Sequence, residues 1–158
     1  MQLLILAVGK IRERYLNVGI EEYLVRLRPY ASVKVIEVKD HTARGTASAE
    51  MTAIQEAEGR ELLRALPSDC QVVALDPEGE RWTSSQFAGK LKQWEITGPH
   101  TVAFLIGGEL GLSDEVRDRC AHRLSLSPMT FTHQLARLIL LEQLYRGFRI
   151  IRGEPYHR

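Results

Sequence analysis

The feature that most constrains the fold of this chain is an alternation of short apolar runs with longer segments of helical periodicity. Five apolar runs predict β-strands, at residues 3–8, 33–38, 71–75, 101–106 and 123–127. Between these runs, apolar residues recur three and four positions apart, which is typical of amphipathic helices. The alternation favours an α/β fold, with a mostly parallel sheet and helices on both faces. In such folds ligands usually bind beyond the carboxyl ends of the strands.

Prolines and helix-capping residues predict where the helices begin and end. Helices over 16–27 and 48–66 are predicted to end ahead of the prolines Pro29 and Pro67. Residues suited to cap a helix precede three further helices: Thr83, Ser113 and Thr132. The last helix, to about Arg146, is predicted to bury Leu135, Leu138, Ile139 and Leu144. Asp76-Pro77-Glu78-Gly79 is predicted to form a turn, and 148–152 a short extended segment before the tail from Gly153.

Length and composition exclude several classes of protein. The 158 residues match one domain, predicted over 1–158, and 44% hydrophobic residues exclude a disordered chain. Two cysteines exclude a disulfide scaffold, and five histidines without ligand spacing predict no metal site. No apolar run reaches the ~20 residues of a membrane helix. The apolar start lacks the features of a signal peptide, so we expect a cytoplasmic protein.

Positive charge is concentrated towards the C-terminus. The net charge of the whole chain is +1, but residues 117–158 contain eight arginines and three acids. Arginine is suited to bidentate phosphate contacts and to stacking on bases. The segment is therefore consistent with nucleic-acid binding, and equally with a solvated basic face.

A glycine-rich segment follows the fourth predicted strand and precedes a short helix. Its pattern, Gly107-Gly108-x-x-Gly111, suits a cofactor loop but is not the spacing of a dinucleotide-binding motif. No acid lies about 20 residues further on, and no phosphate-binding lysine motif occurs. The alternative is a tight turn that needs glycines at positive φ.

The segment 124–133 is mildly apolar and carries no Asp, Glu, Lys or Arg, although it joins a strand to a capped helix. A surface loop of this length normally carries charge. The segment therefore either packs against the core or lines a pocket for an apolar, planar group.

Three segments together resemble one family, the small bacterial ribosomal methyltransferases of the SPOUT superfamily. They are the glycine segment from Phe104 to Ser113, the run Leu124–His133, and the ending from Leu144 to Arg158. The resemblance implies methylation of N3 of a pseudouridine in a stem-loop (helix 69) of 23S ribosomal RNA, with S-adenosylmethionine. It also implies a homodimer, and a deep trefoil knot in a cofactor-binding part of about 70–158.

The resemblance also implies roles for individual residues. The cofactor would be held by Leu75, Gly107, Gly108, Leu126, Ser127, Pro128, Met129, Thr130 and Phe131. The target nucleotide would be met by Arg146, Tyr156, His157 and Arg158. The chain departs from the family pattern at Glu109-Leu110, so no side-chain role is carried over there.

Two other functions compete with this one. A non-catalytic RNA-binding protein would explain the basic C-terminal segment but not an uncharged pocket. An oxidoreductase that binds a nicotinamide or flavin nucleotide would explain the glycines but not their spacing. The apolar character around the last helix predicts a dimer in which the tail reaches the partner's cofactor loop. The rival arrangement folds the tail back on its own subunit.

Overall fold

A computed structural model describes residues 1–156 of the chain. The strands of this part are β1 (Gln2–Val8), β2 (Ser32–Val38), β3 (Gln71–Arg81), β4 (Thr101–Ile106) and β5 (His122–Ser125). The helices are α1 (Arg14–Leu27), α2 (Ser48–Arg64), α3 (Ser84–Thr97), α4 (Asp114–Arg119) and α5 (His133–Ile151). The strands form one sheet in the order β2-β1-β4-β3-β5, and all neighbouring pairs are parallel. The predicted α/β fold with a parallel sheet is confirmed.

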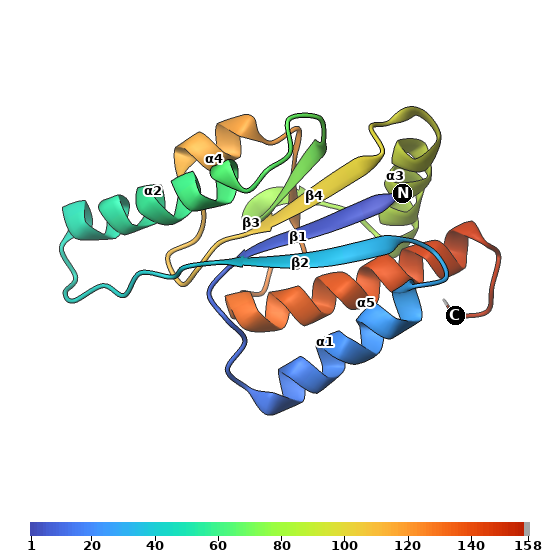
Figure 1. Cartoon of the computed structure of the whole chain (residues 1–158), viewed down its shortest axis with the longest axis horizontal. Helices are drawn as coiled ribbons and strands as arrows, with labels where there is room; N and C mark the ends of the chain where they lie inside the picture. Colours follow the sequence, from blue (N-terminus) through green and yellow to red (C-terminus); the bar gives the residue numbers. More distant parts are fainter. Residues whose placement is uncertain (157–158) are drawn as a thin grey trace.

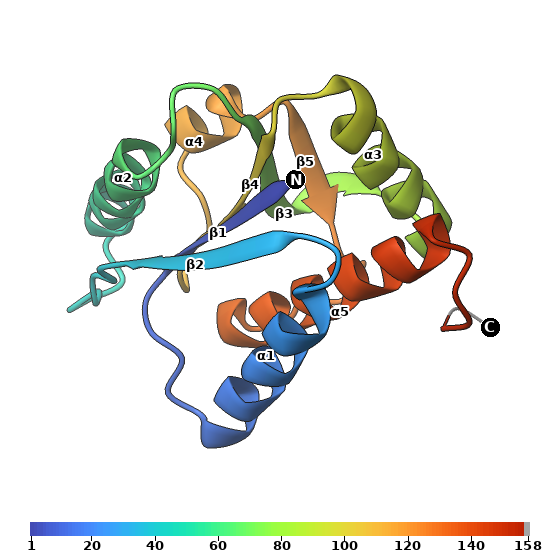
Figure 2. The same cartoon turned by 45° about the vertical axis from the view of Figure 1, so that its right-hand side comes forward.

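Helices cover both faces of this sheet, as predicted (Figures 1 and 2). Alternate residues of β1 point to opposite faces. Leu3 and Ile5 pack in the cluster that includes residues of α1, α3 and α5. Leu4 and Leu6 pack in a second cluster, with Leu62 of α2 and Val116 of α4. Central strands buried on both faces explain why their sequences are continuous apolar runs.

All strands end at the same edge of the sheet, on the left in Figure 1. The glycine segment 107–113 leaves β4 at this edge, and the uncharged segment 126–132 leaves β5 there. Helix α5 then runs back across the sheet to the opposite edge, where the described chain ends (Figure 1). The two ends of α5 therefore belong to different regions of the molecule.

The predicted turn at 76–79 is wrong, because β3 continues through it. The pairing with β5 shifts, so that Leu75 and Glu80 are both opposite Leu124 and the four residues between them form a bulge. The buried carboxyl group of Asp76 accepts hydrogen bonds from the Glu78 amide at 3.0 Å and from Arg117 Nε at 3.0 Å. These bonds hold the bulge against the sheet, so the chain does not reverse.

The predicted extended segment 148–152 is also wrong, because α5 continues to Ile151 and ends ahead of Gly153, which has φ +66°. Phe148 is fully buried and stacks on Tyr30, with ring centroids 5.7 Å apart. The buried face of α5 consists of Arg137, Leu140, Leu141, Leu144, Tyr145, Gly147 and Phe148. Of the four residues predicted to be buried, only Leu144 is; the other three are half-buried.

Candidate functional site

The glycine segment forms a tight turn at the end of β4. The Gly111 amide donates a hydrogen bond to the Gly108 carbonyl oxygen at 3.0 Å, and Gly111 has φ +79°. Gly107 and Gly108 are not at positive φ. The predicted need for glycine at positive φ therefore applies, within this segment, to Gly111 alone. Gly107 is required for another reason: a Cβ atom there would lie 2.6 Å from the Gly111 carbonyl carbon. The backbone of Gly107 touches that of Gly111 in this turn, so a residue with a side chain does not fit at position 107.

The loop after Leu75 touches β5 in a similar way. A Cβ atom on Gly79 would lie 2.5 Å from the Arg123 carbonyl oxygen, so this contact also requires glycine. The Asp76 carboxyl group, 3% exposed, accepts hydrogen bonds from Arg117 of α4 at 3.0 Å and from Arg123 of β5 at 3.5 Å. A cleft of about 350 Å³ opens beside this bulge, between Gly79, Glu80 and the β5 residues. The sequence pattern offered Gly79 only as a turn residue, so this role was missed.

The uncharged segment after β5 is held by its own hydroxyl groups. Ser125 Oγ donates to the Ser127 carbonyl oxygen at 3.0 Å, and Ser127 Oγ accepts from the Met129 amide at 2.9 Å. Leu126 packs against the core, whereas Met129 is 75% exposed. Packing against the core therefore holds for Leu126, whereas Met129 is exposed to solvent; that the segment lines a pocket stays a prediction.

These three loops leave neighbouring strands of one sheet edge. Strand β3, which carries Leu75, pairs with β4 on one side and with β5 on the other. The structure thus places all the residues predicted to hold the cofactor at the same edge of the sheet. The glycine segment 107–113 and the uncharged segment 126–132 carry one charged side chain between them, Glu109, which suits a nucleoside without phosphate groups. Next to Gly108, the buried Glu58 also has a carboxyl oxygen, Oε2, with no hydrogen-bond partner among the described residues. The arrangement fits a bound cofactor of this kind.

Arg146 and Tyr156 meet in a second cluster, built from side chains of α1, α5 and the tail. Glu142 Oε1 accepts hydrogen bonds from Arg146 at 2.7 Å and from the Tyr156 hydroxyl at 3.2 Å. The Arg146 guanidinium carbon lies 4.8 Å from the centroid of the Tyr156 ring. The Tyr156 ring packs on Tyr145, and its hydroxyl lies 3.4 Å from that of Tyr23. Glu142 and Tyr23 were not predicted as site residues.

Burial raises the pKa of Tyr156 well above its ordinary value, and the Tyr23 hydroxyl and the negative charge of Glu142 act in the same direction. Tyr156 therefore keeps its proton at neutral pH and acts as a hydrogen-bond donor in this cluster. The two remaining predicted residues, His157 and Arg158, lie outside the described residues.

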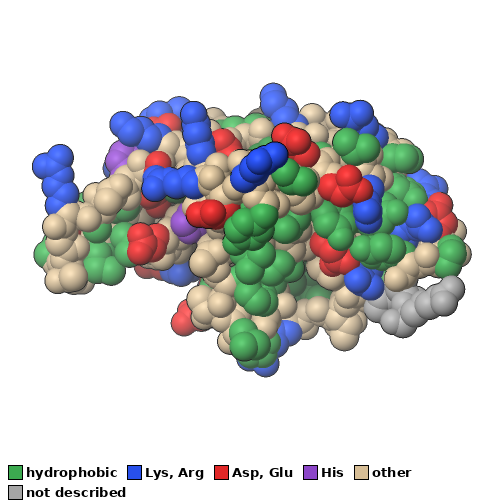
Figure 3. All heavy atoms as spheres, turned by 90° about the horizontal axis from the view of Figure 1, so that it is seen from below, with side chains coloured by type: hydrophobic (Ala, Val, Ile, Leu, Met, Phe, Trp, Pro, Cys, Tyr) green, Lys and Arg blue, Asp and Glu red, His purple; other side chains and the backbone are tan. Residues whose placement is uncertain are grey.

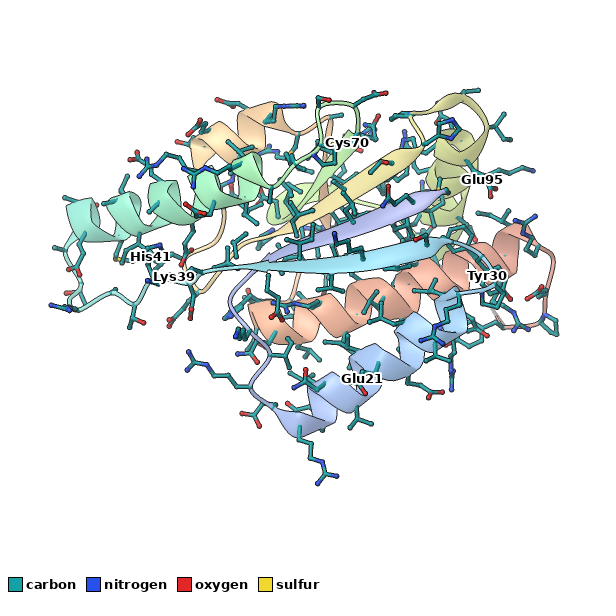
Figure 4. All side chains as sticks on the ribbon, viewed as in Figure 1. Glu21, Tyr30, Lys39, His41, Cys70 and Glu95 are labelled. Carbon is teal, nitrogen blue, oxygen red and sulfur yellow. The ribbon has the colours of Figure 1, made fainter. Side chains whose placement is uncertain are left out.

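The structure does not bring this cluster to the cofactor loops of the same chain. His133, directly after the uncharged segment, and Arg146 are separated along α5 by ~20 Å at the helical rise per residue. Figure 4 shows the same separation: Tyr30, which packs on Phe148, lies at one end of the molecule and His41, close to Glu58, at the other. The residues predicted to hold the cofactor and those predicted to contact the nucleotide therefore lie in two separate regions of the chain.

The face that carries α1 is unusually apolar for a solvent-exposed surface. Tyr15, Val18 and Val25 are 69%, 58% and 51% exposed. Figure 3 shows hydrophobic side chains gathered on this face. Three large exposed apolar side chains on one helix make this face a candidate interaction surface.

Within residues 1–156, no cluster of three or more His, Cys, Asp and Glu side chains could hold a metal ion. The helices of the same described part are all too short or too polar to span a membrane.

Comparison with known proteins identifies relatives over the whole length of the chain. The family described as "Predicted SPOUT methyltransferase" matches residues 1–157. A putative ribosomal RNA large subunit methyltransferase H from Methanoregula boonei is 49% identical over 159 residues, and the alignment covers 100% of both chains. Ribosomal RNA large subunit methyltransferase H from Halothermothrix orenii is 49% identical, with the same coverage.

Two solved structures share the fold at low sequence identity. A probable methylase family protein from Haemophilus influenzae aligns with a TM-score of 0.53 at 11% identity, over 99% of this chain and 70% of that one. A structure described as giving insight into 2-OH methylation of C/U34 on tRNA aligns with a TM-score of 0.51 at 17% identity, over 97% and 98%. With the family match over nearly the whole sequence, the conclusion is that this chain belongs to the SPOUT methyltransferase family.

Proposed function

We propose that the chain methylates large-subunit ribosomal RNA in the cytoplasm. Methyltransferases of this family use S-adenosylmethionine, which is the cofactor of the chain. The observation that carries the proposal is the full-length similarity to ribosomal RNA large subunit methyltransferases, together with three loops at one sheet edge that suit a nucleoside. The family match sets aside the oxidoreductase alternative.

The target within the RNA is proposed from the motifs. The ordered segments 104–113, 124–133 and 144–158 resemble enzymes that modify N3 of a pseudouridine in helix 69 of 23S ribosomal RNA. We assign the same target to this chain. Mass spectrometry of ribosomal RNA from a deletion strain tests the assignment, because the mass of that nucleotide should fall by one methyl group and return on complementation.

We assign cofactor binding to the part of the chain from about 70 to 158 within a single domain. Gly107 and Gly108 let the backbone approach the cofactor, Leu75 contacts its adenosine, and residues 126–131 wrap the adenine. The trefoil knot is proposed for the same part. The proposal is supported by the close contact of Gly79 with the backbone of β5, as expected where two segments cross.

The reacting groups are assigned to residues of this chain around N3. The cofactor supplies an activated methyl group on its sulfonium. Arg146 stabilises the negative charge that develops on the carbonyl groups beside N3 when its proton leaves. Tyr156 donates its one hydroxyl proton to Glu142 and packs its ring on Arg146, so it holds that cation in place. His157 is left as the candidate proton acceptor, and Arg158 as a second cation.

We also propose that the site is completed across a two-fold dimer. The ~20 Å between the cofactor loops and Arg146 is too far for one chain to use both on one nucleotide. Leu140 and Leu141 of α5, predicted to meet the twin helix of a second copy, are instead fully buried within the chain, so that prediction is wrong. The exposed apolar residues Tyr15, Val18 and Val25 lie on α1, and packing of α1 against a second copy would cover them. The tail of one subunit would then meet the cofactor loops of the other.

Calorimetry with S-adenosylmethionine, followed by a methylation assay on 23S ribosomal RNA, tests the activity. We expect cofactor binding and transfer of one methyl group per RNA. RNA binding without cofactor binding would contradict the proposal and support the alternative, a non-catalytic RNA-binding protein.

A further inference from the structure

Helix α2 forms the surface on which the glycine segment rests. Three of its residues on one face, Gln55, Glu58 and Gly59, meet that segment. Gln55 Nε2 donates a hydrogen bond to the Leu110 carbonyl oxygen. Gly59 leaves room for Ser113, since a Cβ atom there would lie 2.4 Å from the Ser113 Oγ atom. The conformation of the glycine segment therefore depends on α2, which none of the sequence motifs includes.

Glu58 is the polar centre of this surface. It is 3% exposed, and its Oε1 atom accepts a hydrogen bond from the His41 amide at 2.9 Å. Its Oε2 atom has no hydrogen-bond partner among the described residues. A Cβ atom on Gly108 would lie only 2.9 Å from Oε2, so this oxygen is directed at the glycine segment. A buried acceptor without a donor is costly and needs an explanation.

The charge of Glu58 is poorly compensated in this structure. Burial raises the pKa of Glu58, the His41 amide lowers it, and the charge of Asp40 raises it. Asp40 and His41, from the segment after β2, are the titratable groups that act on it. The glycine segment faces it with Gly108, which does not titrate. The ionised form of Glu58 is therefore disfavoured relative to that of an exposed glutamate.

We propose that Glu58 is a positioning residue for the cofactor: when S-adenosylmethionine binds, Glu58 Oε2 accepts the backbone N–H of Gly108. The peptide group between Gly107 and Gly108 is flanked by two glycines, so it can turn with little steric cost. The new bond would hold the glycine segment in the conformation that the cofactor needs. The inference rests on the proposed function, since it assumes that this segment contacts the cofactor.

The first test compares cofactor affinity in Glu58→Gln and wild type by calorimetry. Glutamine has one acceptor oxygen, so it cannot accept from the amides of His41 and Gly108 at two separate oxygens. Its NH₂ group would lie against one of these two N–H donors. One lost hydrogen bond to a charged group predicts affinity about tenfold or more below wild type. Glu56→Gln, an exposed change on the same helix, is the matched control and should bind normally. Equal affinity of Glu58→Gln and wild type would overturn the inference.

The second test needs no variant. If the bound state requires ionised Glu58, binding releases a proton, and affinity rises with pH through the pKa of Glu58 in the free protein. Calorimetry between pH 5 and 8, in buffers of different ionisation enthalpy, measures this release. Where Glu58→Gln folds, as judged by its melting temperature, its affinity for the cofactor should not show this rise with pH. An affinity that changes with pH in the same way in wild type and in Glu58→Gln would contradict the inference.

A third measurement identifies the donor. Methylthioadenosine lacks the amino-acid part of the cofactor, and its binding should release the same proton if Gly108 is the donor. Loss of the release with methylthioadenosine would assign the donor to the cofactor's ammonium group and overturn the role of Gly108. Failure of wild type to bind S-adenosylmethionine at all would instead refute the proposed function.

Discussion

The two halves of the proposed site are built in opposite ways. The cofactor half, at the carboxyl edge of the sheet, is made of backbone: Gly107 against Gly111, and Gly79 against β5. The nucleotide half, around the end of α5, is made of side chains: Glu142, Arg146 and Tyr156 joined by hydrogen bonds and ring contacts. Backbone contacts fix a shape and tolerate no added atom, whereas a side-chain cluster can lose one member and keep its fold. Substitutions in the cofactor half should therefore abolish binding, whereas substitutions in the nucleotide half should reduce activity by degrees.

The largest effect is expected in the backbone half. In Gly107→Ala a single methyl group would lie 2.6 Å from the Gly111 carbonyl carbon, so the turn must open. We expect no detectable binding of S-adenosylmethionine by calorimetry, with circular dichroism close to wild type because the loop lies at the sheet edge. Gly89→Ala is the matched control, because nothing lies within 4 Å of a Cβ atom at that position. Normal cofactor affinity in Gly107→Ala would refute the backbone account.

The next effect is expected in the side-chain half. Arg146→Ala removes the cation assigned to the developing charge on the base, and losses of this kind reduce rates by about 100-fold or more. Methylation of ribosomal RNA should fall by that factor, while cofactor affinity stays within about twofold of wild type. Parallel losses of binding and rate would show that Arg146 supports the cofactor half instead.

Mixed dimers test whether the halves belong to different chains. Gly107→Ala has an intact tail, and a chain that ends before Tyr156 has intact loops, so each is inactive alone. After subunit exchange, half of the dimers are mixed, and each contains one complete site across the boundary. About a quarter of wild-type activity should return. If native mass spectrometry confirms exchange and no activity appears, the tail acts on its own subunit.

The smallest effect is expected for Tyr156→Phe. The change removes the hydroxyl that donates to Glu142 and keeps the ring under Arg146. A reduction of about tenfold in methylation rate is expected, which corresponds to one hydrogen bond. Because burial raises the pKa of Tyr156, its proton stays in place from pH 6 to 9, and both proteins should show the same pH–rate profile. A pH dependence that disappears in Tyr156→Phe would make Tyr156 the base.

The sequence by itself determined the local features of this molecule. Apolar runs predicted the five strands, and the caps Thr83, Ser113 and Thr132 each accept a backbone amide as expected. The glycine and uncharged segments were predicted as loops, and both are loops at the ligand edge. These features depend on interactions within a few residues, which a linear pattern records directly.

Only the tertiary structure decided which residues of α5 are buried and how far apart the two halves lie. Arg137 is 1% exposed because it donates to Glu37 at 2.6 Å and to the Gly9 carbonyl oxygen at 3.0 Å. Those partners are 100 and 128 residues away, so the periodicity of apolar residues did not include Arg137 in the predicted buried face. Glu58 was missed for the same reason, since its neighbour Gly108 lies on another element. Contacts between distant residues leave no trace in local spacing, and they decide where each functional group lies.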